Sequence, residues 1–382
     1  MTSGIHAPSQ ATAVEQFLLA CLRSRWDASA LSEVRGQSER SAEDWIAFRQ
    51  LAMRENVAPL LYASLRGRGI LPPSVEGDLA SAYFHTAARN TLMLRQLEEL
   101  LIRLDAAHVP AIALKGAALV ESVYGNAAVR PMVDLDLLVK EQDVPAALAC
   151  MRDAGFSALH PRGYKAEIIH QNPAPGSPPV ELHWNLFVPP YFSYALPMAW
   201  FWETAIPVET DTGQSIMVLG PEAQLLHLCG HLYVHHWAPG DSPRLLWLHD
   251  VAELIVASPQ LDWGRVIEVA RQGGLVTSLQ AVTQRLVQAW HLDLPGNIAA
   301  QLESLEPGAT ELRLIASLAQ APPSLFGQLK LDLSLLPTWR ARAHFLWRNL
   351  FPPAGYMREL YGAGGVLGVP RQYLRRWLEM LT

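Results

Sequence analysis

The chain has 382 residues, and its 30 lysines and arginines stand against 36 aspartates and glutamates, for a formal net charge of −6. Half of the residues are hydrophobic and 17% are charged, a composition that excludes an intrinsically disordered chain. The mild acidity argues against a protein that coats nucleic acid or clings to anionic lipid. At about 150 residues per domain, the length predicts two or three structural units.

The cysteines and the N-terminus indicate a cytoplasmic protein. Cys21, Cys150 and Cys229 are odd in number, lie far apart and form no C-x-x-C pair, so we expect neither a disulfide framework nor a thiolate zinc site. No lysine or arginine precedes Arg23, and the first apolar run is interrupted by polar residues. This pattern is not that of a secretory signal peptide.

Helical periodicity dominates the first hundred residues. The segment from Ser41 to Asp44 resembles a capping box ahead of apolar residues at helical spacing. After Pro72 and Pro73, the pattern predicts one long amphipathic helix over residues 79–104. We expect this region to contribute core packing and no catalytic or ligand-binding residues.

The pattern changes at Val109, where short apolar runs begin to alternate with helical segments. Such alternation indicates a mixed α/β module of about a hundred residues. We predict strands at 110–114, 132–139, within 179–188 and at 215–219, and helices at 116–124 and 144–154.

From Pro221 onward the helical period returns, punctuated by proline and glycine. We predict helices at 222–236, 245–256, 263–271, 275–290, 310–318 and 373–381. The predicted fold class is therefore α+β, with a small mixed-sheet core between two helical regions. The predicted units are an N-terminal helical region at 1–108, an α/β core at 109–219 and a C-terminal helical domain at 220–382.

Residues 182–202 imitate a membrane span, because they contain no Asp, Glu, Lys or Arg and many aromatic residues. Pro189, Pro190 and Pro197 would break a spanning helix, however. We interpret the stretch as a strand end that continues into an aromatic loop, and we expect no membrane partner.

Two aspartates lie within the second predicted strand. Residues two apart on a strand project from the same face, so Asp134 and Asp136 project together. Two adjacent carboxylates repel each other unless a cation binds between them, and Mg²⁺ is a hard ion that prefers oxygen ligands. Flanking apolar residues indicate a central strand, whereas on an edge strand the pair would be only a solvated face. The pattern therefore predicts a magnesium site.

A turn of Lys115, Gly116 and two alanines precedes the first helix of this module. Small residues let backbone N–H groups approach phosphate oxygens, and a helix N-terminus favours anions. Lys115 would add a positive charge for the phosphates. The alternative interpretation is an ordinary strand-to-helix turn.

A third carboxylate is expected from another strand. Alternation over residues 179–185 places Glu181, His183 and Asn185 on one face. Glu181 is the candidate third metal ligand, with a surface strand residue as the alternative. His183 is either a hydrogen-bonded structural histidine or a contact to substrate.

The order and spacing of these motifs resemble a known family. The motifs are residues 114–116, Tyr124, Arg130, and the segments 134–139 and 180–184. Together they resemble the uncharacterised nucleotidyltransferase family of the polymerase-β-like superfamily. Segments 225–231 and 246–250 resemble its helical part. The resemblance implies these candidate residues: for catalysis and the metal, Asp134, Asp136 and Glu181; for the nucleotide phosphates, Lys115, Gly116 and Arg130. We add His183 and Tyr124 as candidates for contact with the substrate.

By this resemblance the protein is an enzyme that transfers a nucleoside monophosphate from an NTP such as ATP to a hydroxyl group and releases pyrophosphate. Two Mg²⁺ ions are the implied cofactors, with Mn²⁺ as the alternative ion. The acceptor stays open between a small molecule, a peptide, a protein and a tRNA end. The sequence carries no strong nucleic-acid signal, since the arginines and tryptophans near the C-terminus are equally typical of packed helices.

Two other functions remain open. One is a binding module that keeps the fold and recruits a nucleotide or a partner, without catalysis. The other is a histidine-centred phosphohydrolase, because His227, His231 and His235 recur at i, i+4 and i+8 along one predicted helical face, and His249-Asp250 follows. Leu228 replaces the glutamate of the H-E-x-x-H zinc helix, which favours a structural or cleft-lining role for these histidines.

Overall fold

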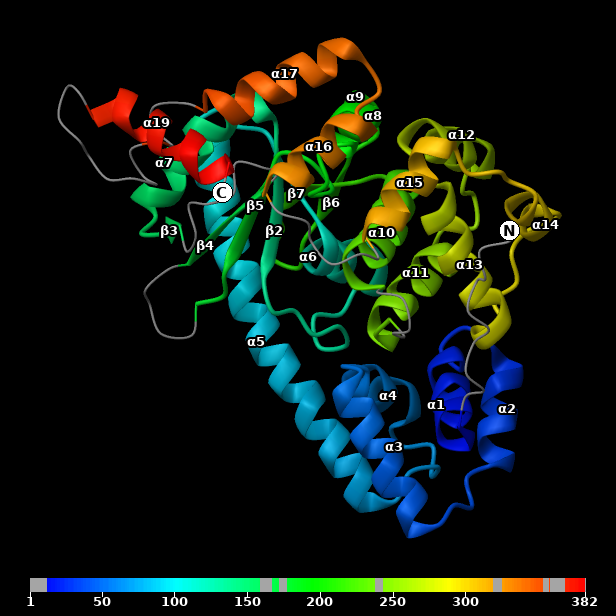
Figure 1. The fold of residues 1–382 in the computed structure, drawn as a ribbon. Helices are drawn as coiled ribbons and strands as arrows, with labels where there is room; N and C mark the ends of the chain where they lie inside the picture. The colour runs from blue at the N-terminus through cyan, green and yellow to red at the C-terminus, as the bar shows by residue number, and fades with distance from the viewer. Residues whose placement is uncertain are drawn as a thin grey trace.

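The computed structural model describes residues 12–158, 167–171, 177–237, 243–318, 325–352, 357 and 368–381. Five helices open the chain, and the fifth is much longer than the others (Figure 1). The Ser41 hydroxyl accepts a hydrogen bond from the Asp44 backbone N–H at 3.1 Å, so the predicted N-terminal cap is confirmed. These helices are α1 (Ala13–Arg23), α2 (Ala28–Gly36), α3 (Ala42–Arg54), α4 (Ala58–Leu65) and α5 (Pro73–Ala106).

A seven-stranded mixed sheet forms the centre, in the order β3-β4-β5-β2-β1-β7-β6. The pairs β2–β5 and β1–β7 are parallel, and the other neighbours are antiparallel. The strands are β1 (Ala111–Ala113), β2 (Leu135–Val139), β3 (Ser157–Ala158), β4 (Glu167–Gln171), β5 (Val180–His183), β6 (Ile206–Glu209) and β7 (Ser215–Val218).

Short helices connect the strands, and a helical region follows them. A π-helical turn, Val120–Tyr124, continues directly from α6. The connecting helices are α6 (Lys115–Leu119), α7 (Val144–Asp153), α8 (Phe192–Ala195) and α9 (Met198–Glu203). The later helices are α10 (Pro221–His236), α11 (Leu245–Ala257), α12 (Trp263–Gly273), α13 (Val276–Trp290), α14 (Ile298–Glu303), α15 (Ala309–Leu318), α16 (Leu325–Leu335), α17 (Trp339–Leu350) and α19 (Gly368–Leu381).

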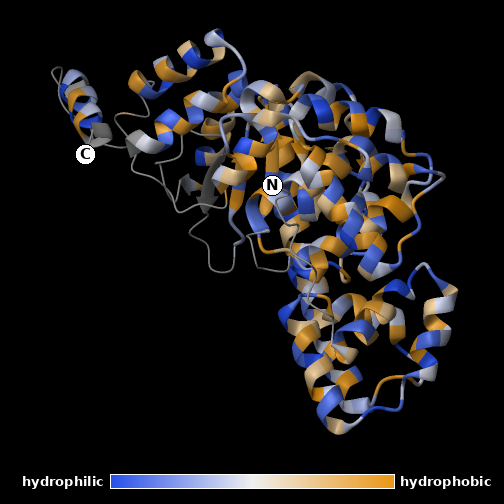
Figure 2. Cartoon of the chain, turned by 45° about the vertical axis from the view of Figure 1, so that its right-hand side comes forward, coloured by the Kyte–Doolittle hydropathy of each residue, from blue (hydrophilic) through white to orange (hydrophobic). Residues whose placement is uncertain are grey.

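The two faces of the sheet belong to two hydrophobic cores. Alternation sends Leu135 and Leu137 of β2 into one core with the C-terminal half of α5 and with α7. Leu138 joins the other core, which contains α10 to α13 and also α1, α3 and α4. Hydrophobic residues concentrate where the helices pack on one another (Figure 2). Asp136 shares the face of Leu138, so it projects toward α10 rather than toward α5.

The observed strands differ from the predicted ones in two respects. β2 begins at Leu135 instead of 132, and in the segment before it the carbonyl oxygen of Val133 accepts a hydrogen bond from the Arg89 side chain at 3.4 Å rather than from a neighbouring strand. Strands β3, β4 and β6 extend the sheet beyond the four predicted strands.

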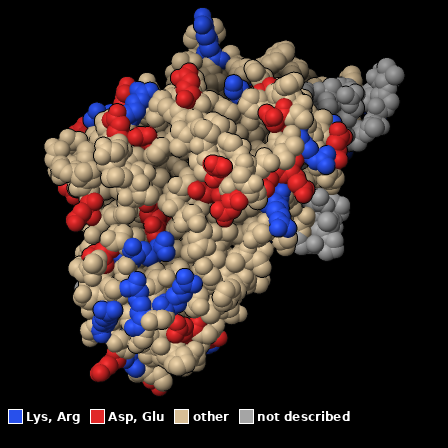
Figure 3. Space-filling view, turned by 180° about the vertical axis from the view of Figure 1, so that it is seen from behind, with Lys and Arg blue, Asp and Glu red and all other residues tan. Residues whose placement is uncertain are grey.

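The predicted division of the chain into three units, with boundaries at 108 and 220, stays a prediction. Helices from both flanking regions contribute to one hydrophobic core. Among the described helices, none combines the length and the apolarity that crossing a membrane requires. From behind, several lysine and arginine side chains gather on the lower part of the molecule, while acidic side chains are more frequent above it (Figure 3).

Candidate active site

The predicted acidic residues meet on two neighbouring strands. Asp136 is the second residue of β2, and it lies directly beside Glu181 of β5 in the parallel register. His183 follows two residues along β5, on the same face as Glu181. The ligand atoms of Asp136, Glu181 and His183 lie within 4.8 Å of one another, and they form the one such group of three that the described residues contain. Two carboxylates and an imidazole at this spacing suit a divalent cation.

Lys115 already balances part of this negative charge. Its Nζ lies 2.7 Å from Asp136 Oδ1 and 3.7 Å from Glu181 Oε2. His183 Nε2 is 2.9 Å from the same Asp136 oxygen. Burial alone would raise the pKa of the Asp136 carboxyl, but Lys115 and His183 hold it well below its usual range. Burial lowers the pKa of Lys115, yet the charges of Asp136 and Glu181 raise it above the ordinary value. The pair is therefore charged at neutral pH.

Asp134 lies next to these residues, in the segment that leads into β2. It precedes β2 and is half-buried, and it is not a member of the group of three. Burial, followed by the charges of Asp136 and Glu181, raises the pKa of its carboxyl to about 6. The structure thus places Asp134 beside the group, close enough to feel both carboxylates. We call Lys115, Asp134, Asp136, Glu181 and His183 the carboxylate centre.

The carboxylate centre opens into a large cavity of about 1360 Å³. This volume exceeds the roughly 300–1,000 Å³ of a typical small-molecule site, so the cavity has room for more than one ligand. All three parts of the chain line it, and Asp136 lies behind the wall. The lining includes Arg49, His85 and Arg89 from the N-terminal helices, Lys115, Asp134, Glu181 and His183 from the core, and His231, His235, His236, Arg244 and Trp247 from the C-terminal helices.

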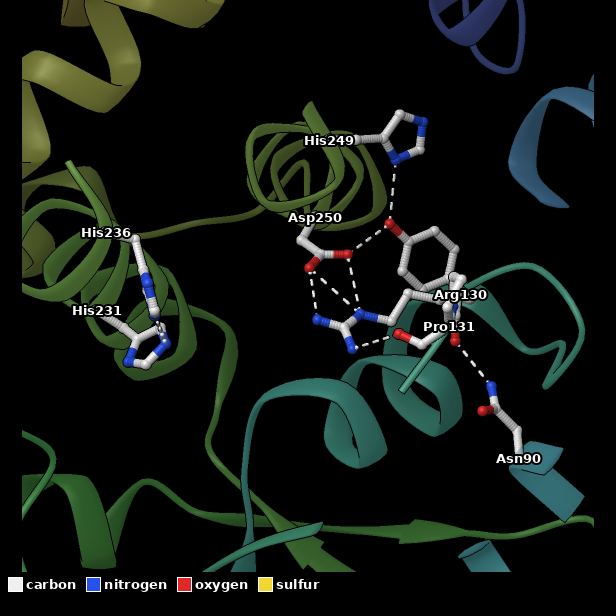
Figure 4. Close-up of polar contacts among 8 residues, drawn as sticks. Asn90, Arg130, Pro131, His231, His236, His249 and Asp250 are labelled. Carbon is white, nitrogen blue, oxygen red and sulfur yellow. Dashed lines mark hydrogen bonds and ion pairs between the residues drawn. The ribbon is translucent and has the colours of Figure 1, made fainter. Parts of the chain in front are cut away.

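Arg130 belongs to a separate hydrogen-bonded cluster on Asp250 and His249, which Figure 4 shows and which we call the Arg130–Asp250 network. Tyr124 is also part of it. Arg130 Nη2 donates to Asp250 Oδ2 at 2.9 Å, and its Nε lies 3.3 Å from both oxygens. The Tyr124 hydroxyl donates to Asp250 Oδ1 at 2.8 Å and is 3.0 Å from His249 Nδ1. Burial, together with the charge of Asp250, raises the pKa of the Tyr124 hydroxyl.

This placement bears on two predicted contacts. Arg130 borders the cavity, but its guanidinium is paired with Asp250, whereas Tyr124 is not among the residues that line the cavity. The contact of Arg130 with phosphates and that of Tyr124 with substrate stay predictions. The sequence pattern could not reveal the network, since Asp250 lies 120 residues from Arg130 and carries no local signature of an arginine partner.

Gly116 connects the two clusters. A Cβ atom at this position would overlap the Arg130 guanidinium and would lie 2.9 Å from Met132 Cγ. A side chain here would therefore push Arg130 away from Asp250. The close approach explains why glycine follows Lys115. Contact of the Gly116 amide with phosphate stays a prediction.

The histidines of α10 extend from the carboxylate centre along the cavity wall. His227 is buried, and burial together with the charge of Lys115 lowers the pKa of its imidazole to about 3. Nε2 of His231 lies 3.1 Å from Nε2 of His236, and both side chains are drawn in Figure 4. His236 packs on Trp247 with a ring separation of 4.3 Å. These contacts favour the predicted structural or cleft-lining role.

Sequence reasoning missed the N-terminal wall of the cavity. Arg49, His85 and Arg89 lie on α3 and α5, a region in which we expected no chemistry. Their helical spacing marks them only as surface residues, because the opposing wall is built from segments far away in the sequence.

Comparison with known proteins identifies the family. The model of the family described as uncharacterised nucleotidyltransferase matches residues 41–290, about two thirds of the chain. The chain therefore belongs to this family and is a transferase of nucleotidyl groups. No curated protein sequence matches it.

Two solved structures resemble the chain. The solution structure of the antibiotic-resistance factor ANT(2'')-Ia is 14% identical, with a TM-score of 0.35, and the match covers 53% of this chain and 97% of that one. The crystal structure of an antigenic nucleotidyltransferase-like protein from Paracoccidioides brasiliensis is 17% identical, with a TM-score of 0.38, and the match covers 56% of this chain and 98% of that one.

Proposed function

We propose that this member of the nucleotidyltransferase family uses divalent cations, Mg²⁺ or Mn²⁺, to transfer a nucleoside monophosphate from an NTP to a hydroxyl group of an acceptor. The observation that carries the proposal is the convergence of Asp136, Glu181 and His183 beside Asp134 at the wall of the large cavity. Oxygen-rich donor sets of this kind suit the hard cations that accompany triphosphates. The ammonium group of Lys115 between two carboxylates marks a position that favours positive charge.

In the proposed reaction, Asp134, Asp136 and Glu181 hold the cations. When bound there, the cations would supply positive charge against the triphosphate and would lower the pKa of the acceptor hydroxyl. The acceptor hydroxyl gives up its proton to water as its oxygen forms a bond to the α-phosphorus, the bond from that phosphorus to the β-phosphate oxygen breaks, and pyrophosphate leaves.

The surrounding residues orient the reactants in this proposal. Lys115 and the backbone at Gly116 offset charge on the leaving phosphates. His183 positions the Asp136 carboxylate through their 2.9 Å contact. Arg130 maintains the turn next to Gly116, while the α10 histidines and the N-terminal wall enclose the acceptor.

The direct test is incubation with each of the four labelled ribonucleotides, Mg²⁺ and fractionated cell extract. We expect a labelled product and stoichiometric pyrophosphate with one nucleotide at least. Glu181→Gln should abolish both signals without changing the melting temperature by more than a few degrees. Product formation that persists in a folded Glu181→Gln variant would contradict the proposed site.

Neither alternative function is favoured by a specific observation. The histidines of α10 do not form a group of three with metal-ligand spacing among the described residues, whereas the carboxylate centre does. A binding module without catalysis predicts nucleotide binding without pyrophosphate release, which the same experiment separates.

A further inference from the structure

The Lys115 side chain stands where a cation would bind. Its Nζ contacts Asp136 Oδ1 at 2.7 Å and approaches Glu181 Oε2 to 3.7 Å, and these two residues supply two of the three ligands of the convergent group. A divalent cation bound by both of these carboxylate oxygens would need the space that the ammonium group fills, so the two cannot be present there together. Their charges also repel strongly at such short range.

Access to Asp136 depends on this lysine. Asp136 is 2% exposed and does not line the cavity, whereas Lys115, Glu181 and His183 do. Asp136 Oδ1 is contacted twice, by Lys115 Nζ and by His183 Nε2. A cation that arrives from the cavity therefore meets the ammonium group before it reaches the buried carboxylate.

The backbone holds Lys115 in an uncommon conformation. Its φ angle is +46°, in the left-handed region that residues with a side chain rarely adopt, and it is the first residue of α6, separated from β1 by Leu114 alone. Such a conformation persists only where the surrounding contacts determine it. Here the contacts are with Asp136 and Glu181, so the fold places the ammonium group between the two acids.

We propose that Lys115 is a resident counter-cation that keeps free metal ions out of the centre and yields its place when the triphosphate arrives. This inference rests on the proposed function, since it concerns the same carboxylates. The phosphates of an NTP supply new negative partners for the ammonium group, which then leaves Asp136 and Glu181 to the metal. The metal consequently enters together with the nucleotide, and the centre discriminates against metal alone.

The test measures Mn²⁺ binding alone by electron paramagnetic resonance, in wild type, Lys115→Met and Lys140→Met. Lys140 is the matched control, because it is exposed after β2, its Nζ lies 5.3 Å from the Trp202 ring, and it does not line the cavity. We expect Lys115→Met to bind Mn²⁺ on the order of tenfold more tightly than wild type, since the positive charge that competes for Asp136 and Glu181 is removed. Lys140→Met should equal wild type.

A second arm adds a non-hydrolysable NTP analogue. The advantage of Lys115→Met should disappear or reverse, because the variant lacks a partner for the phosphates. A role for Lys115 in packing alone would not produce this reversal. Lys115→Arg keeps the positive charge and should retain the weak Mn²⁺ binding of wild type. If Lys115→Met does not fold, Lys115→Gln serves as the neutral variant.

Two outcomes would overturn the account in distinguishable ways. In the first, Lys115→Met and Lys115→Gln bind Mn²⁺ no more tightly than wild type, while Glu181→Gln binds it more weakly than wild type. This result would reject the role of Lys115 and would retain the metal site. Mn²⁺ binding that Glu181→Gln does not change, with or without the analogue, would reject the site itself.

Discussion

Two clusters of charged side chains lie on either side of the Lys115–Gly116 turn, and they differ in how far protein groups balance the charge of their carboxylates. In the Arg130–Asp250 network, a carboxylate that is 1% exposed accepts hydrogen bonds from Arg130 and Tyr124, so protein groups satisfy it. In the carboxylate centre, three acids face one lysine and one histidine, and Asp134 and Glu181 border open space. The excess negative charge at a cavity distinguishes a site from a structural ion pair.

The comparison predicts opposite responses to the same chemical change. Neutralising an acid in the network leaves a buried guanidinium without its partner, which lowers stability. Neutralising Asp134 in the carboxylate centre removes a half-buried charge that Asp136 and Glu181 repel, which spares stability and removes function. The predictions follow from the largest expected effect to the smallest.

Asp250→Asn should give the largest loss of stability, about 3–5 kcal/mol, because Arg130 would stay buried without a counter-charge. Urea unfolding followed by tryptophan fluorescence measures it. Asp78→Asn is the control, since its 2.7 Å pair with Arg49 is about half exposed and should contribute less than about 1 kcal/mol. Equal losses in the two variants would contradict a structural role for the network.

Asp134→Asn should lower pyrophosphate release by about 100-fold or more, equivalent to roughly 2.7 kcal/mol in the barrier. Its stability should equal or exceed that of wild type, because burial, followed by the charges of Asp136 and Glu181, already raises the pKa of this carboxyl to about 6. Steady-state kinetics and urea unfolding on one preparation measure both effects. A destabilised variant with full activity would reverse the assignment of the two clusters.

Gly116→Ala should destabilise the protein by about 1–3 kcal/mol, because its Cβ would overlap the Arg130 guanidinium and crowd Met132. Gly77→Ala provides the control: it lies within α5 with nothing within 4 Å of the added Cβ, and alanine should stabilise that helix by roughly 0.5–1 kcal/mol. Chemical denaturation of the two variants gives the contrast. Neutral behaviour of Gly116→Ala would mean that Arg130 does not depend on this turn.

Tyr124→Phe should have the smallest effect, about 1 kcal/mol of stability, since it removes one hydroxyl hydrogen bond to Asp250. Calorimetric titration with a non-hydrolysable NTP analogue and Mg²⁺ should give an unchanged affinity. A selective loss of acceptor turnover, with unchanged stability, would instead support the contact with substrate that the sequence resemblance implies.

Much of the carboxylate centre was predictable because it rests on strand alternation. The two-residue period placed Glu181 with His183, and the apolar flanks identified a central strand for Asp136. Asp134 lies one residue before β2 begins, so the two-residue period of the strand does not by itself fix the position of its side chain. Local patterns report the geometry of one element and do not show where that element ends.

The partners that complete each cluster were beyond the reach of local patterns. Arg130 could be singled out, but Asp250, its partner on α11, could not be matched to it from spacing. The N-terminal wall of the cavity was missed for the same reason, since Arg49 and Arg89 acquire a role only when the helices pack around the sheet. Tertiary packing decides between a structural arginine and a phosphate-binding one.

The most direct test of the central claim locates the metal. Crystals soaked with Mn²⁺ and a non-hydrolysable NTP analogue would be measured at the manganese absorption edge. The account predicts anomalous density between Asp134, Asp136 and Glu181, with the triphosphate in the cavity beside Lys115. Density at His231 and His236, with none at the carboxylates, would contradict it.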